Sequence, residues 1–122
     1  MSIQLANRIK VVPVHDVSEI ENGVVTLKSG KVWYEYYTEN ELEFREEQKD
    51  ELMFSQKLSP AISMVKADMD KFIRRQLIVT LFDSSQTAYI WGSLDNGVRF
   101  TVETYPDRYA LEMSRASETP IF

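Results

Sequence analysis

The chain contains no cysteine and a single histidine among its 122 residues. Disulfides, thiolate zinc sites and cysteine nucleophiles are therefore excluded, and a transition-metal site would depend on carboxylates alone. The four glycines stand singly, so no glycine-rich phosphate loop is present. We therefore expect neither a metal nor a cofactor.

Long apolar runs are also absent. No stretch approaches the roughly 18 consecutive apolar residues that a membrane helix requires. The start of the chain, residues 1–7, has neither the basic end nor the apolar run of a secretory signal. These absences predict a cytoplasmic protein that makes no contact with a membrane.

The apolar content of 43% is, by contrast, close to that of ordinary globular proteins. A chain of this length fits one domain, and no repeat, low-complexity tract or linker divides it. We therefore expect a single domain over residues 1–122. Residues 115–122 are polar except for Ile121 and Phe122, and they form a candidate extended tail.

Much of the chain alternates apolar and polar residues with the period of two that is typical of strands, and about seven or eight strands are expected. Residues 76–82 form the most continuous apolar run, which predicts a central strand buried on both faces, with 87–91 as its hairpin partner. Residues 24–27 and 31–37 predict a second hairpin across a glycine-containing loop. Asn22-Gly23 predicts a turn, Pro13 a strand edge or end, and the polar residues 46–50 a loop.

One segment has a different period. Val65, Met69, Phe72 and Ile73 recur at i, i+4, i+7 and i+8, which predicts an amphipathic helix over about residues 63–75, with Ser63 as its N-cap. The sequence therefore predicts an α+β, mostly β fold. We expect an antiparallel sheet, or a small sandwich or barrel, with this one helix against it.

The net charge of −5 is concentrated in residues 39–51. That segment has two bases, Arg45 and Lys49, and seven acids, whereas the remaining 12 acids and 12 bases cancel. The acids are Glu39, Glu41, Glu43, Glu46, Glu47, Asp50 and Glu51. The run is interpreted as a solvated face and loop or, among functional roles, as an interface for a basic partner surface. Direct binding to nucleic acid is not expected, because the bases at 71, 74 and 75 fall in the last helical turns, where they complement the helix dipole.

Aromatic side chains occupy both faces of one predicted strand. Tyr34 and Tyr36 share one face, and Trp33, Glu35 and Tyr37 share the other, which is either an exposed interface or a second buried face. The apolar chain end could dock on the domain itself or on a neighbour. The candidate interaction surface therefore comprises Trp33, Glu35, Tyr37, Glu39, Glu41, Glu43, Glu46, Glu47, Asp50, Glu51, Ile121 and Phe122.

Three short motifs have a possible chemical role, but each is better explained by local structure. His15 and Asp16 could form a general-base pair, yet they follow a strand end and have no assignable third partner. Asp83-Ser84-Ser85 and Asp95-Asn96-Gly97 combine an acid with other polar groups, but both lie between predicted strands and are typical of turns. No catalytic residue is assigned, and a non-enzymatic protein is expected.

Several short patterns occur in a fixed order along the last two-thirds of the chain. An acidic stretch at 44–49 precedes F-x-Q-x-L at 54–58, a short helix, and an apolar strand that ends in an Asp turn at 77–85. A segment at 92–100 that begins with glycine and ends in Arg-Phe, and a Y-x-L strand at 109–114, complete the order. This order resembles that of small proteins encoded among the structural genes of tailed phages and prophages of Bacteroidota. The chain departs from that family at 50–53, where a glycine-containing segment is usual, and at 105–108, where the final hairpin is shortened.

The resemblance implies a virion or assembly component of the neck or tail, such as a tail-completion or head–tail joining protein. Its partners would be itself and other virion proteins, and it would pass from the host cytoplasm into the virion. The alternative is a monomeric accessory protein that binds a single host or phage protein. A third class, a carboxylate hydrolase, would require Glu41, Glu43 or Glu46 to meet another acid in a cleft.

Overall fold

The computed structural model describes residues 2–38, 42–59, 66–73, 75–106, 109–119 and 121. Within them lie eleven strands, one 3-10 turn and one α-helix, in agreement with the predicted α+β, mostly β fold. In chain order these are β1 (Ser2–Leu5), β2 (Arg8–Pro13), η1 (Val14–Asp16), β3 (Val17–Glu21), β4 (Val24–Leu27), β5 (Tyr34–Tyr37), β6 (Leu42–Asp50), β7 (Met53–Leu58), α1 (Lys66–Phe72), β8 (Gln76–Phe82), β9 (Ala88–Trp91), β10 (Val98–Thr104) and β11 (Tyr109–Ser117).

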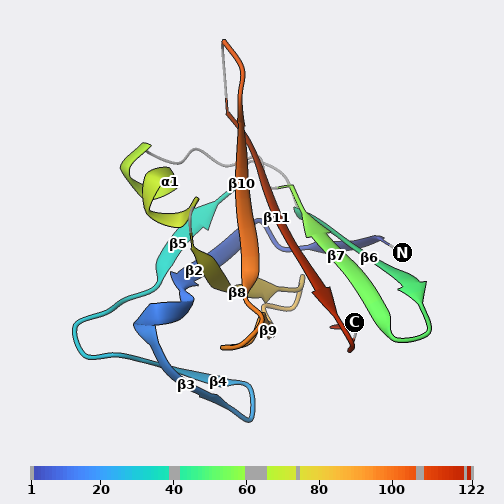
Figure 1. Ribbon diagram of the computed structural model, residues 1–122, viewed down its shortest axis with the longest axis horizontal. Helices are drawn as coiled ribbons and strands as arrows, with labels where there is room; N and C mark the ends of the chain where they lie inside the picture. The colour runs from blue at the N-terminus through green and yellow to red at the C-terminus, as the bar shows by residue number, and fades with distance from the viewer. Residues whose placement is uncertain are drawn as a thin grey trace.

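The main sheet is antiparallel and has the strand order β1-β6-β7-β11-β10-β8-β2-β5, with β9 paired to β8. The edge strand β1 lies near the opposite part of the sheet, because the Ala6 amide just after β1 donates to the Phe82 carbonyl at the end of β8 (2.8 Å). The β3–β4 hairpin forms a separate small sheet. The β10–β11 hairpin extends well beyond the body, and the β6–β7 and β3–β4 hairpins project on other sides (Figure 1).

The core lies on the concave side of the main sheet. Its largest side chains come from strands distant in sequence, among them Phe44, Trp91 and Met113, which are all fully buried. Helix α1 contributes Met69 and Phe72 to the same cluster. The Phe72 ring meets the Tyr34 ring edge-on at 5.3 Å and the Phe100 ring at 6.0 Å, so aromatic contacts anchor the helix.

Several predicted strands are confirmed. Strand β8 is buried from Leu77 to Phe82, lies between neighbours on both edges, and pairs with β9 as expected. In β10, Val98 and Phe100 face the core, and in β11 Leu111 and Met113 do the same. These strands were predictable because burial on one or both faces determines their side-chain pattern directly.

The predicted hairpin between residues 24–27 and 31–37 is wrong. Strand β4 pairs with β3 across Asn22-Gly23, both with positive φ (52° and 76°), as a two-residue hairpin turn requires. Strand β5 pairs with β2 instead, so β2 is an internal strand. Pro13 lies at the end of β2, beyond the residues that pair with β5, where its missing N–H costs no ladder bond.

The bounds of three elements also differ from expectation. Residues 46–50, predicted as a loop, continue strand β6, because their partners on β7 extend the ladder to the turn at residues 51 and 52. Helix α1 ends at Phe72 and not at about residue 75, and Ser63, Val65 and Arg74 lie outside the described residues. Strand β11 continues to Ser117, so any tail begins after that residue.

Candidate interaction surface

The aromatic strand β5 has one buried and one exposed face. Tyr34 and Tyr36 pack against the main core, and the Tyr36 hydroxyl donates to Asp68 of α1 (2.7 Å). On the other face Tyr37 is 62% exposed. Trp33, just before β5, is half-buried against a second cluster that contains Val12, Val17 and Ile78. Of the predicted aromatic surface, only Glu35 and Tyr37 lie open to solvent.

Glu35 on this exposed face is surrounded by partners. Its carboxylate lies 3.6 Å from Lys10 Nζ and 3.9 Å from Arg8, and it accepts a hydrogen bond from the Tyr37 hydroxyl. The Tyr37 bond, followed by Lys10 and Arg8, holds the pKa of Glu35 below its ordinary value. The charge of Glu35 is thus balanced within the outer face of β2 and β5.

The acidic segment divides between the two faces of β6. Glu43 and Glu47 point outward, where they pair with Arg45 and Lys49 at 3.0 Å each. Glu39 and Glu41 lie outside the described residues. At the β6–β7 turn, Asp50 Oδ1 accepts the Leu52 amide (2.8 Å). We call Asp50, Glu51 and Leu52 the acidic tip; Leu52 is 73% exposed.

Glu46 is not part of an outer surface, contrary to its place in the predicted interaction surface. It is 4% exposed, because the alternation along β6 places Glu46 on the core side together with Leu42 and Phe44. Its Oε2 accepts the Gln56 amide (2.7 Å) and the Ile121 backbone N–H (2.9 Å). Glu43 and Glu46 therefore face opposite sides of the sheet.

Gln56 extends this buried polar network. Its Oε1 accepts the Trp91 indole N–H at 2.9 Å, and both side chains are completely buried. The network joins β6, β7, β9 and the chain end, where Ile121 packs partly buried against the core. Ile121 thus docks on its own domain, one of the two alternatives for the apolar end, whereas Phe122 lies outside the described residues.

A basic groove not predicted from the sequence lies on the outer face of β7, β10 and β11. Strand register places Arg99 opposite Ser114 and Ser114 opposite Lys57, so the two cations flank one serine. Together with Arg115 they surround a cavity of about 360 Å³. We call this cavity the basic groove; it is lined by Ser55, Lys57, Asn96, Gly97, Arg99, Ser114, Arg115 and Ala116.

The loop at residues 93–97 forms one wall of the basic groove. Arg115 Nε donates to the Asn96 carbonyl, and the Asn96 side-chain amide donates to the Ala116 carbonyl, each at 2.8 Å. Partial burial lowers the pKa of Arg115 from its ordinary value, while Asp95 acts in the opposite direction. A Cβ on Gly97 would lie 2.7 Å from the Gln76 Cβ, so only glycine lets the loop approach β8 this closely. The Asp95-Asn96-Gly97 motif is therefore structural.

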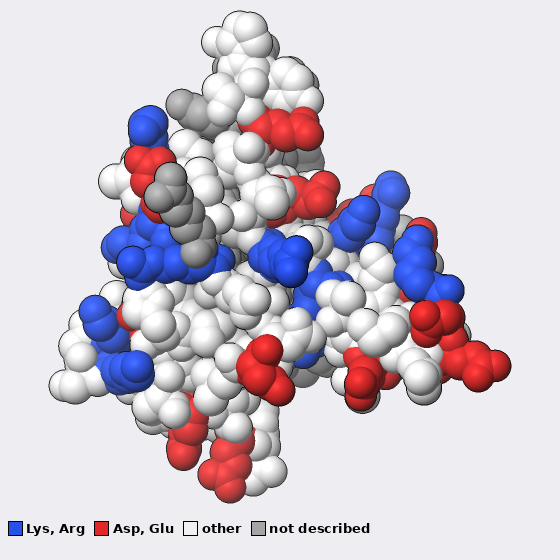
Figure 2. All heavy atoms as spheres, viewed as in Figure 1, with Lys and Arg blue, Asp and Glu red and all other residues white. Residues whose placement is uncertain are grey.

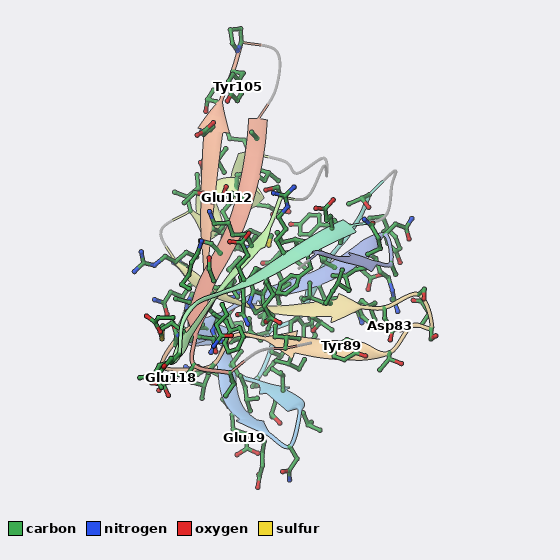
Figure 3. The ribbon with its side chains drawn as sticks, turned by 90° about the vertical axis from the view of Figure 1, so that its right-hand side faces the viewer. Glu19, Asp83, Tyr89, Tyr105, Glu112 and Glu118 are labelled. Atoms are coloured by element: carbon green, nitrogen blue, oxygen red, sulfur yellow. The ribbon has the colours of Figure 1, made fainter. Side chains whose placement is uncertain are left out.

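The other two motifs also act in local structure. His15 Nε2 lies 3.1 Å from Asp16 Oδ1, and the His15 ring contacts Arg75 beyond α1, so these residues connect η1 to the start of β8. Asp83 Oδ1 accepts the amides of Ser85 and Thr87 at 2.9 Å each. Asp83 and Tyr89 lie side by side at the end of the β8–β9 hairpin (Figure 3), where the Tyr89 hydroxyl donates to Asp83 (3.2 Å).

We predict that Asp83 contributes an acid-sensitive part of the stability. The Thr87 and Ser85 amides lower its pKa below the ordinary 3.8. Ionised Asp83 therefore stabilises the fold above about pH 4, and this contribution is lost as the pH falls through the lower folded-state pKa. Urea unfolding of the parent chain and of Asp83→Asn between pH 7 and acid should show the parent losing more stability. Equal pH dependence in the two proteins would contradict the prediction.

Comparisons with known proteins identify no relative of this chain. No family model, no curated protein and no solved structure matches it. No helix in the described part of the chain is long and apolar enough to cross a membrane. Among the described side chains, no three His, Cys, Asp or Glu residues group as metal ligands would.

Proposed function

We propose that the chain is a non-enzymatic virion or assembly protein of a tailed phage, in the neck or tail, that acts by self-association and by contacts with other virion proteins. The order of short patterns along residues 44–114, which resembles that of phage structural proteins, supports this proposal. Its physical support is the surface at the ends of the hairpins.

Three projecting hairpins each carry an exposed apolar or aromatic side chain at or beside their turn. Val24 of β3–β4 is 64% exposed, Leu52 of β6–β7 is 73% exposed, and Tyr105 of β10–β11 is 41% exposed. Tyr105 lies near the far end of the longest hairpin, well away from the core (Figure 3). A single exposed apolar residue is ordinary on a protein surface. Exposed apolar or aromatic residues at the ends of three hairpins favour contacts in which each hairpin inserts into a neighbouring molecule. This observation carries the proposal.

Light scattering coupled to size exclusion, over a series of protein concentrations, tests the proposal. We expect a mass that exceeds one chain and rises with concentration, because heterologous contacts build rings or filaments. A strict monomer that also binds no other virion protein would overturn the proposal. A monomer that forms a one-to-one complex with a single host or phage protein would support the accessory-protein alternative.

A further inference from the structure

We propose that the basic groove binds the acidic tip of the β6–β7 hairpin of a second copy of this chain. The inference rests on the self-association proposed above and names the two surfaces that meet. Carboxylates of Asp50 and Glu51 would lie against Lys57 and Arg99, and Leu52 would lie over the groove.

The groove has unused positive charge. Lys57 and Arg99 are exposed, and within the described part of the chain neither side chain makes a hydrogen bond or an ion pair. Arg45, the next cation in the same row across the sheet, is already paired with Glu43. The polar groups of Ser114 and Ser55 lie between the strands of the groove and can donate to a carboxylate. The groove therefore offers two free cations and two hydroxyls to an anionic group.

The acidic tip has the complementary charge. Glu47 is paired with Lys49, so the uncompensated carboxylates are those of Asp50 and Glu51, both exposed at the turn. The pairing lowers the pKa of Glu47 and keeps it ionised. Leu52 beside them adds an apolar group that gains from leaving water.

The tip cannot reach the groove of its own molecule. The groove residues Ser55 and Lys57 lie on β7, and the tip is the turn that precedes this strand. Met53, the first residue of β7, is four residues from Lys57, about 13 Å along an extended strand. The ladders from β6 through β7 to β11 hold β7 in its extended form, so the tip stays beyond the end of this strand. An acidic tip that binds the groove must therefore come from another molecule.

The surroundings of the groove favour a short acidic segment over a nucleic-acid backbone. Glu112 and Glu43 line the neighbouring cavity on one side, and Asp95 and Glu118 line that on the other. Figure 2 shows Lys and Arg side chains across the middle of this face, with Asp and Glu side chains above and below. A phosphate chain running through the groove would approach these carboxylates, whereas a hairpin tip can enter between them.

The contact would be heterologous, because groove and tip are different surfaces of the same chain. Each copy could then bind one neighbour through its groove and another through its tip. Repetition of such a contact closes into a ring when the rotation permits and otherwise forms a filament. Because the contact depends on charge, added salt should weaken it.

Paired charge reversals test the proposal in the full chain. The groove variant carries Lys57→Glu and Arg99→Glu, and the tip variant carries Asp50→Lys and Glu51→Lys. A matched control, Lys28→Glu with Lys66→Glu, reverses two exposed charges outside both surfaces. We expect the groove and tip variants to associate at least about tenfold more weakly than the parent in light scattering, and the control to be unchanged.

Combining the groove and tip reversals in one chain restores opposite charges at the contact. We expect this chain to recover association, which a merely misfolded variant would not do. The inference would be overturned if the combined variant keeps the parent's circular dichroism and unfolding midpoint but does not regain association.

The remaining outcomes separate this inference from the proposed function. If the parent assembles and every charge-reversal variant assembles to the same mass, the groove–tip contact is wrong but the proposed self-association stands. A parent that never associates would overturn both. Binding of a fluorescent DNA duplex by the parent, lost in the groove variant while assembly persists, would overturn the inference and assign the groove to nucleic acid.

Discussion

Replacing Gln56 by leucine is expected to lower the free energy of unfolding by about 3–5 kcal/mol. The substitution keeps the side-chain volume similar but removes both polar ends of a buried amide. The Trp91 indole N–H then loses its acceptor, and the Glu46 carboxylate loses the amide that donates at 2.7 Å. A buried donor without its partner costs about 1–3 kcal/mol, and a charged group costs more.

Urea unfolding with a fit of the midpoint and slope measures this loss. Gln48→Leu is the matched control, because Gln48 is an exposed residue on β6 and undergoes the same chemical change. We expect the control to shift the free energy of unfolding by no more than about 0.5 kcal/mol. Amide exchange adds a second readout, since the Ile121 N–H shares Glu46 Oε2 with Gln56 and should lose protection. Similar stabilities for the two variants would refute a structural role for the network.

Phe72→Ala is expected to cost about 3–5 kcal/mol of stability and to release helix α1 from the sheet. Phe72 is completely buried and makes edge-on ring contacts with Tyr34 of β5 and Phe100 of β10. Most helical stability in proteins comes from packing of the apolar face, and Met69 and Phe72 supply that face in the described part of α1. Met69 alone cannot fill the space that the lost ring leaves.

Ile73→Ala is the control for this substitution. Ile73 follows Phe72 directly but is 43% exposed, so its truncation should cost about 1 kcal/mol or less. Urea unfolding compares the two variants, and limited proteolysis reports whether the segment around α1 opens before the sheet unfolds. Equal costs for the two substitutions would show that the ring contacts of Phe72 do not anchor the helix.

Short-range patterns identified the elements that depend on burial. The continuous apolar run of β8, the alternation of β10 and the buried stripe of α1 are each visible in a few adjacent residues. The Asn22-Gly23 turn was equally visible, but its partner strand was misassigned because a turn signal does not say which flanking run pairs across it. The polar β3 strand, with Val17 buried and Ser18 and Glu19 exposed, lacked the apolar content to mark it.

For the candidate interaction surface, too, the local pattern predicted some positions and missed others. Alternation placed Glu43 outward and put Glu35 and Tyr37 on one face, but it left open whether that face is exposed. The continuation of the alternation into Glu46 was hidden by the polar composition of residues 46–50. Alternation alone would have placed Glu46 inward with Phe44, and only an available buried partner such as Gln56 makes that position tolerable for a carboxylate.

The amino-acid sequence determined which residues of the basic groove point outward, because side-chain direction in a strand depends only on local position. It also determined that the charge of the chain gathers beside the β6–β7 turn. Only the tertiary structure decided that Lys57, Arg99 and Arg115 surround one cavity, since this depends on the pairing of β7 with β11 and of β11 with β10. Lys57 and Arg99 are far apart in the sequence and meet only because both pair with Ser114. Strand pairing uses backbone hydrogen bonds that every residue type can make, so the sequence around each cation does not indicate its neighbours.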